Sequence, residues 1–383
     1  MGDELAKPVE DMKGDAHNSR AISCSGCHGG NPSAAQAEQA MNPAKGFIAQ
    51  PVGKDRITMC ARCHSDPQFM KKYNPTLRVD QADLYWTSIH GKRLMEGDPK
   101  VATCTSCHGY HKVYPPTDSR SSVYPTHVHE TCGKCHSNSE HMKQYGIPIN
   151  QVEEYKHSVH GVKLLENGDL ASPTCNDCHG NHGATPPGIK SLAYVCSRCH
   201  PIQQELFTAS PHGRALEQYG KPSCDDCHHR HKIVHPTDDM IGVGEGAVCA
   251  TCHSEGDNGW QVAQAMRAKI DGLKEDIAAA DNQLTQAEDN GMPSVDARYD
   301  LSQAESLLVQ IRTLIHSFSL SVVDSRLTEA DAKARSARDA ARKFFDEIVK
   351  RKAGLWITWL FIVLFSIGIL IKIQELRKKD KPQ

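Results

Sequence analysis

The arrangement of the cysteines constrains this chain more than any other feature of its sequence. All 16 cysteines of the 383 residues belong to eight C-x-x-C-H motifs. The cysteine pairs are Cys24 and Cys27, Cys60 and Cys63, Cys104 and Cys107, Cys132 and Cys135, Cys175 and Cys178, Cys196 and Cys199, Cys224 and Cys227, and Cys249 and Cys252. One isolated C-x-x-C fits a zinc knuckle, a redox dithiol or a haem attachment site. Eight copies that all continue into histidine, with no cysteine left for a disulfide, favour covalent haem c at every motif.

The motifs are embedded in a longer repeat. Three segments read S-x-H-G-x-x-L, and they are residues 88–94, 158–164 and 210–216. Each is followed by a C-x-x-C-H, by a second histidine three residues after the motif histidine, and by another C-x-x-C-H. The first two motifs form a less regular copy, in which His17 takes the upstream position and Asn31 replaces the second histidine. The repeating unit of the predicted fold is therefore a pair of haems.

Haem is expected to supply most of the core of this region. Residues 17–253 carry all eight motifs, with only about 30 residues for each, which is too few for a separate side-chain core. Scattered glycine and proline, as in the pair Pro186 and Pro187, favour short helical turns joined by loops. We therefore expect a mainly α fold with extensive loops. The formal net charge of −2 gives no reason to expect a nucleic-acid partner.

The histidines divide into proximal and distal candidates for the irons. The proximal candidates are the motif histidines His28, His64, His108, His136, His179, His200, His228 and His253. The distal candidates at repeated positions are His17, His90, His160 and His212 upstream, and His111, His182 and His231 downstream. A downstream histidine cannot reach the opposite face of its own haem, so it must ligate a neighbouring haem or none. A surface or turn role remains the alternative for each of these seven.

Seven distal candidates leave the eighth iron without a second histidine from the repeated positions. His129, just before Cys132, and His316, near the end of a predicted helix, are the two candidates. The alternative for His316 is a structural role beside the helix seam. Five further histidines are not expected to be ligands, namely His127, His141, His157, His229 and His235. No methionine occupies a repeated position, so bis-histidine haems of low potential are expected.

A helical region follows the last motif. Apolar residues from Ala263 to Ala287 recur alternately every three and four residues, and Asn290 with Gly291 is expected to end this helix. The positions are Ala263, Met266, Ile270, Leu273, Ile277, Ala280, Leu284 and Ala287. A second run contains Leu301, Ala304, Leu308, Ile311, Ile315 and Phe318. The two are predicted to form an antiparallel hairpin. A third, more charged helix is expected over about residues 328–352.

The chain is predicted to end in one membrane helix. Residues 354–371 contain no charge, and at ~1.5 Å per residue they span roughly 27 Å. A buried core helix is the alternative. Basic residues flank both ends, but thioethers form outside the cytoplasm, so the C-terminus is expected to be cytoplasmic. A secretory signal is expected to be missing from this numbering, because residues 1–16 are polar. The predicted domains are 1–255, 256–352, 353–373 and 374–383.

The repeats resemble those of the multihaem c-type cytochromes of respiratory electron transfer, and the resemblance covers residues 17–253. It implies electron transfer rather than a reaction on a substrate. A haem region anchored by one C-terminal helix is also similar in architecture to the cytochrome c1 subunit of quinol-oxidising bc complexes. This similarity implies a quinol-oxidising cytochrome b-type subunit as membrane partner, a periplasmic electron carrier, and a location at the bacterial cytoplasmic membrane with the haems in the periplasm.

An enzyme is the competing interpretation. Eight c-type haems followed by long helices also resemble the octahaem hydroxylamine oxidoreductase family. That resemblance implies one iron with an open position, and Tyr299 is the nearest counterpart of the family's tyrosine from the helical region. The C-x-x-C-K motif of nitrite-reducing relatives does not occur, since all eight motifs end in histidine. We favour electron transfer and expect every iron to have two ligands.

Overall fold

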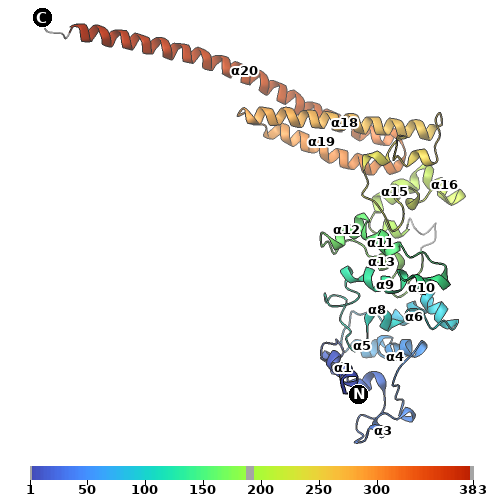
Figure 1. The fold of residues 1–383 in the computed structure, drawn as a ribbon. Coiled ribbons are helices and arrows are strands. Elements are labelled where there is room, and N and C mark those ends of the chain that lie inside the picture. Colours follow the sequence, from blue (N-terminus) through green and yellow to red (C-terminus); the bar gives the residue numbers. More distant parts are fainter. Residues whose placement is uncertain (1, 187–193, 380–383) are drawn as a thin grey trace. The chain divides into compact units, whose positions relative to one another are not determined.

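The computed structural model describes residues 2–186 and 194–379 (Figure 1). These residues are mainly helical and include no strand, which confirms the predicted fold class at this level. They form two compact units: residues 1–198 with 223–236, and residues 199–222 with 237–383. The predicted loop at Pro187 and the last four residues of the predicted cytoplasmic tail lie outside the described residues.

The first unit consists of short helices joined by loops, as the glycine and proline content predicts. None of its described helices exceeds the 11 residues of α1 and α4. The helices are α1 (Gly2–Met12), α2 (Cys24–His28), α3 (Ala37–Ala40), α4 (Lys54–His64), α5 (Pro67–Met70), α6 (Gln81–Thr87), α7 (Ile89–Met95), α8 (Cys104–His108), α9 (Val128–His136), α10 (Ser139–Met142), α11 (Gln151–Lys156), α12 (Val159–Leu165), α13 (Cys175–His179) and α17 (Cys224–His228). Four 3-10 turns are η1 (Asn18–Arg20), η2 (Pro43–Lys45), η3 (Pro125–His127) and η4 (Lys143–Tyr145).

The S-x-H-G-x-x-L segment is a tight junction between two helices. Ser88 is the N-cap of α7: its Oγ accepts from the Gly91 amide at 2.9 Å and donates to the Tyr85 carbonyl at 2.6 Å. A Cβ on Gly91 would lie 2.1 Å from that carbonyl oxygen, so only glycine fits. Leu94 is buried beneath the junction. The same contacts recur at Ser158 with Gly161 and Tyr155, and at Ser210 with Gly213 and Phe207.

The C-x-x-C-H motifs form the helical turns that the sequence predicts. Four of them are the five-residue helices α2, α8, α13 and α17, while two close the longer helices α4 and α9. Capping boxes begin three of the short helices and use the residues before and within the motif, namely Thr103 with Ser106, Thr174 with Asp177, and Ser223 with Asp226. The two thiols of a motif therefore lie one helical turn apart, on one face.

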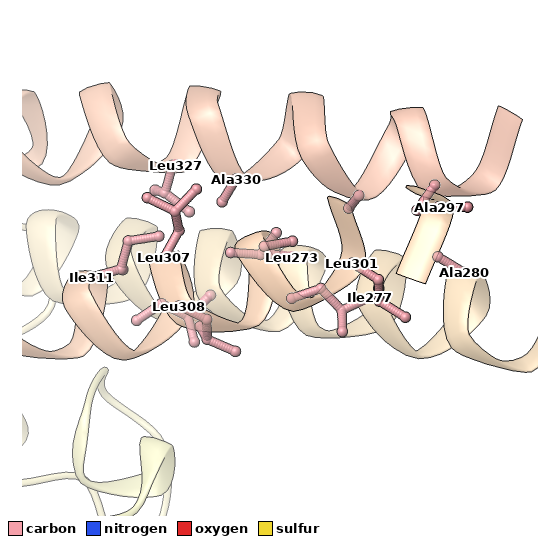
Figure 2. Close-up of a cluster of buried hydrophobic side chains, with 14 of the residues drawn as sticks. Leu273, Ile277, Ala280, Ala297, Leu301, Leu307, Leu308, Ile311, Leu327 and Ala330 are labelled. Carbon is pink, nitrogen blue, oxygen red and sulfur yellow. The ribbon is translucent and has the colours of Figure 1, made fainter. Parts of the chain in front are cut away.

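The second unit contains a three-helix bundle. The elements of this unit are α15 (Pro201–Ala209), α16 (Pro211–Tyr219), η5 (Asp238–Met240), η6 (Cys249–Thr251), α18 (Asn258–Asp289), α19 (Val295–Leu314), η7 (Ile315–Ser317) and α20 (Leu320–Lys379). The bundle consists of α18, α19 and α20. All eight apolar positions predicted as the seam of the first long helix are buried in α18. Leu301, Ala304, Leu308 and Ile311 are buried in α19, also as predicted. Figure 2 shows part of this core, to which all three helices contribute.

The third helix of this region leads into the apolar segment as predicted, but it differs from the prediction in two respects. The helix begins at Leu320 rather than near residue 328, and it completes the bundle core instead of only leading to the membrane. Its buried positions recur every three or four residues, but most are alanine: Val323, Leu327, Ala330, Ala334, Ala337 and Ala341. Alanine gives a weak apolar signal, yet it lets helices approach closely, which explains both the contact and the missed prediction.

One described helix is long and apolar enough to cross a membrane. It is α20, which continues without a break from the bundle into the uncharged segment 354–371. The side chains of its most apolar window are not buried within the chain, which argues against the alternative of a core helix.

Candidate haem-ligand histidine pairs

Among the described residues, six pairs of histidine rings meet, and each pair joins a motif histidine to a repeated distal candidate. The distances between ring centroids are 5.8–6.2 Å. Five pairs lie in the first unit: His17 with His64, His28 with His111, His90 with His136, His108 with His182, and His179 with His231. The pair His212 with His253 lies in the second unit.

The spacing of these pairs fits two imidazoles on opposite sides of one metal ion. A metal–imidazole nitrogen bond is about 2 Å long, so the two nitrogens are expected about 4 Å apart and the ring centroids about 6 Å apart. The Nε2 atoms of His28 and His111 lie 3.5 Å apart, which is long for a hydrogen bond. The residues present therefore fit a haem iron with two axial histidines.

The pairs follow a simple rule along the chain. An upstream histidine pairs with the second motif histidine of its own copy, as His90 does with His136. A downstream histidine pairs instead with the first motif histidine of the preceding copy, as His182 does with His108. The expectation that downstream histidines serve a neighbour agrees with this geometry. Neighbouring copies are thus interlocked, because each copy provides its downstream histidine to the copy before it.

Backbone hydrogen bonds reinforce the same interlocking. The amide of the residue before an upstream histidine donates to the carbonyl two residues after a downstream histidine in the next copy. The bonds are Ala16 to Val113 at 2.9 Å, Ile89 to Ala184 at 3.1 Å and Val159 to Ile233 at 2.7 Å. In the last copy the corresponding residue is Pro211, which has no amide hydrogen. The last copy therefore cannot form this backbone hydrogen bond.

Several rings are oriented through Nδ1, which leaves Nε2 directed at the partner ring. The Nδ1 of His28 donates to the Ile48 carbonyl at 2.7 Å, and the Nδ1 of His17 to the Asp15 carboxylate at 2.8 Å. In metal sites this second hydrogen bond fixes the tautomer and makes Nε2 the ligand atom. These bonds therefore prepare the imidazoles for coordination.

Burial favours the neutral form of several of the paired imidazoles. It lowers the pKa of His108 to about 4, with a further lowering by the neighbouring His182 and His64. Burial also lowers the pKa of His90 and His136, and in His90 the ring of His136 adds to the effect. A neutral imidazole offers a free lone pair, whereas a protonated one cannot bind a metal.

The first cysteines of successive motifs meet in three places. The thiols of each pair are close enough to shift each other's pKa, and the pairs are Cys60 with Cys104, Cys132 with Cys175, and Cys196 with Cys224. In each case the contact and burial raise the pKa of the first thiol, while the contact lowers the pKa of the second, to about 7 for Cys224. None of the 16 cysteines is in a disulfide, so these are contacts between separate side chains. The attachment points of neighbouring motifs are therefore adjacent.

The pair in the second unit is built into one end of the bundle. The ring of His212 packs on Phe318 with 3.9 Å between ring centroids, and Phe318 also contacts Phe207. His253 faces Asp257, the N-cap of α18, with 3.2 Å between Nδ1 and Oδ1. Phe318 was predicted to belong to a helix seam. Instead it lies after η7 in the left-handed conformation, at φ +50°, and packs beside the candidate haem ligand.

The remaining candidates keep the status of predictions. They are His160, His200 and His228 at repeated positions, and His129 and His316 for the eighth iron. His129 is buried at the start of α9, and its Nδ1 has no hydrogen-bond partner among the described residues. His316 lies in η7, just beyond the helix on which it was predicted, and its Nδ1 donates to the Thr313 carbonyl at 2.9 Å. Tyr299 is 63% exposed on α19.

Comparison with known proteins identifies no relative of this chain. No protein-family model matches the chain, and no curated protein matches it. The functional argument therefore depends on the cysteine motifs, the histidine pairs and the membrane helix.

Proposed function

We propose that this chain is an electron-transfer protein that carries eight covalently attached haems c. The observation that carries the proposal is the set of six histidine pairs, each with the ring spacing of a bis-histidine metal site. Each pair contains the histidine of a C-x-x-C-H motif, and in five of the six the two thiols of that motif lie on the same helix as the histidine. Two thiols that attach the porphyrin and two imidazoles that bind the iron are the protein groups that a bis-histidine c-type haem requires.

The chain's own residues explain why transfer is favoured over catalysis. Haem supplies a one-electron redox centre when it is bound. In each of the six pairs, two imidazoles would hold the iron of a bound haem, so no open position would remain for a substrate. The interlocked copies and the adjacent first cysteines hold neighbouring attachment sites close together. Short separations between such sites favour the passage of electrons along the chain.

We further propose where the protein works. Thioether formation outside the cytoplasm and a single apolar helix suit a protein anchored in the bacterial cytoplasmic membrane, with the haems in the periplasm and the C-terminus in the cytoplasm. Its partners would be a quinol-oxidising complex of the cytochrome b type and a periplasmic electron carrier. An octahaem oxidoreductase remains the second candidate, and it requires one iron with an open position.

Mass spectrometry and electron paramagnetic resonance of the purified full-length protein test the proposal. We expect a mass increment of eight haems, only low-spin signals in the oxidised state, and no change of the reduced spectrum with carbon monoxide. Fewer haems, or bound zinc, would contradict the cofactor assignment. A stoichiometric high-spin signal that responds to carbon monoxide would instead support the oxidoreductase.

A further inference from the structure

In the second unit, the length of the helix bundle sets the distance between the His212–His253 pair and the membrane helix. Helix α20 runs from Leu320 to Lys379 as a single element of 60 residues. It is part of the bundle core as far as Ile348, which packs on Met292 in the turn between α18 and α19. The uncharged segment begins at Gly354, six residues later. The turn between α18 and α19 is therefore the end of the bundle next to the membrane.

The histidine pair lies at the opposite end of the bundle. His253 contacts Asp257, where α18 begins, and His212 contacts Phe318, two residues before α20 begins. Helices α18 and α20 both start at this end and run toward the membrane segment (Figure 1). The pair and the apolar segment are thus separated by the full length of the bundle.

This length is large compared with the reach of direct electron exchange. Residues 320–354 form 35 helical residues, which span about 50 Å at ~1.5 Å per residue. A tilt of about 40°, the upper end of the usual range for membrane helices, still leaves about 40 Å. No proline interrupts the helix, so only gentle curvature is expected.

Ion pairs between the helices stiffen the bundle along this length. Lys269 on α18 pairs with Asp324 at 2.8 Å, and Arg338 on α20 pairs with Asp276 at 2.7 Å. On α19, Asp300 accepts from Lys333 at 2.8 Å. Together with the continuous apolar core, these contacts make residues 258–348, here called the stalk, a rigid spacer.

We propose that the stalk holds the haem of the His212–His253 site about 50 Å above the membrane, where it exchanges electrons with a redox centre in an extramembrane domain of the partner. Electron tunnelling falls steeply with distance, so a quinol or a haem within the bilayer is too remote to be the direct partner. One electron passes between the partner's centre, a haem or iron–sulfur cluster, and this haem, and the centre that loses it is oxidised. The inference rests on the proposed function, and it limits the partner's redox centre to one that lies outside the bilayer.

The height of the stalk can be measured in the full-length holoprotein in lipid nanodiscs. Two matched variants, Asn258→Cys and Asn290→Cys, place one thiol at the far end and one at the near end, and both positions are exposed. If every native cysteine is a thioether, each variant takes one spin label, whereas additional labels reveal free thiols and refute the haem assignment. Nickel-chelating lipids report proximity to the bilayer through faster spin relaxation, and zinc-loaded lipids are the control.

We expect nickel to enhance relaxation at position 290 and to leave position 258 at the level of the zinc control. Equal enhancement at both positions would mean that the stalk lies along the membrane, and enhancement at neither would mean that the anchor is wrong. Either result overturns the proposal. As a second readout, a long-chain menaquinol in the same nanodiscs should not directly reduce the haem of the His212–His253 site, although dithionite does. Reduction by menaquinol alone would refute the need for an extramembrane partner centre.

Discussion

The stalk and the first unit differ in what surrounds their side chains. Among the described residues, the stalk buries 22 hydrophobic side chains within residues 258–348, whereas the first unit buries ten in more than twice that length. The apolar cluster of the first unit contains only four buried residues, which are Ile57, Tyr85, Leu94 and Val101. The paired histidines and contacting cysteines of the first unit are instead only partly buried by the surrounding side chains.

This difference indicates two ways of offsetting the entropy of ordering a chain. Burial of apolar surface contributes roughly 25 cal/mol per Å², and the close-packed stalk core supplies it from side chains alone. The first unit has too little such surface to offset a cost of about 1–2 kcal/mol per residue for its backbone. Its order is therefore expected to depend on the cofactor that its cysteines and histidines would hold, as folding depends on metal in small metal-binding domains.

The largest expected effect is the loss of the whole first unit when haem is not attached. In a host without the thioether-forming machinery, we expect the full-length chain to retain a folded stalk and to lose ordered structure in residues 17–198. Hydrogen–deuterium exchange should show slow exchange in α18 and α19 and fast exchange in α6–α13. Equal protection of both regions without haem would refute the dependence.

A smaller effect is expected from the loss of one distal histidine. His182→Ala removes the partner of His108, so one haem of the eight should become high-spin in the oxidised protein, while the stalk keeps its exchange rates. His157→Ala is the matched control, because the side chain of His157 is exposed and its Nδ1 donates to the preceding helix at the Glu153 carbonyl. Low-spin spectra from both variants would show that His182 is not a ligand.

The sequence predicted the local elements of both regions better than their partners. Ala263 to Ala287 were predicted as a helix seam and are buried, because apolar side chains recurring at helical spacing are a strong signal. The alanine seam of α20 was missed because the same spacing carried by alanine looks like a solvated helix. Which histidine meets which was not predictable, since His28 and His111 are brought together only by the packing of successive copies.

The roles of the S-x-H-G residues were also only partly predictable. The sequence marked His90 as a candidate ligand, and the structure adds that Ser88 caps the helix and that Gly91 permits the close junction. A repeat that combines a ligand, a cap and a packing glycine can be recognised without knowing which residue has which role. Phe318 gave no separate signal, because its contact with His212 depends on the left-handed turn after η7.

A still smaller effect is expected from a cavity in the stalk. Ile270 is fully buried in the bundle core, so Ile270→Ala should lower the free energy of unfolding of the stalk by about 2–5 kcal/mol. Ile57→Ala is the counterpart in the first unit of the haem-loaded protein. It should cost less than half as much, because the small cluster around Ile57 has more freedom to collapse into the space. Exchange rates of the slowest amides in each unit measure both values, and a larger loss at Ile57 would contradict the comparison.

The smallest expected effect concerns an ion pair that ties a loop of the second unit to the stalk. Asp238 in η5 is buried and accepts from Arg312 at 2.8 Å and from Lys274 at 2.8 Å, and these cations lower its pKa to about 2. Because the pKa is lower in the folded state, the stabilisation is present above about pH 4 and is lost as the pH falls toward 2. The contribution is roughly 1–2 kcal/mol at neutral pH.

Asp238→Asn should therefore lower the free energy of unfolding at pH 7 and flatten its decline between pH 4 and 2, as measured by hydrogen exchange in an acid titration. Asp239→Asn, at an exposed carboxylate that pairs with Arg267, is the matched control and should keep the wild-type decline. The same slope in all three proteins would show that this buried pair contributes nothing to the stability of the second unit.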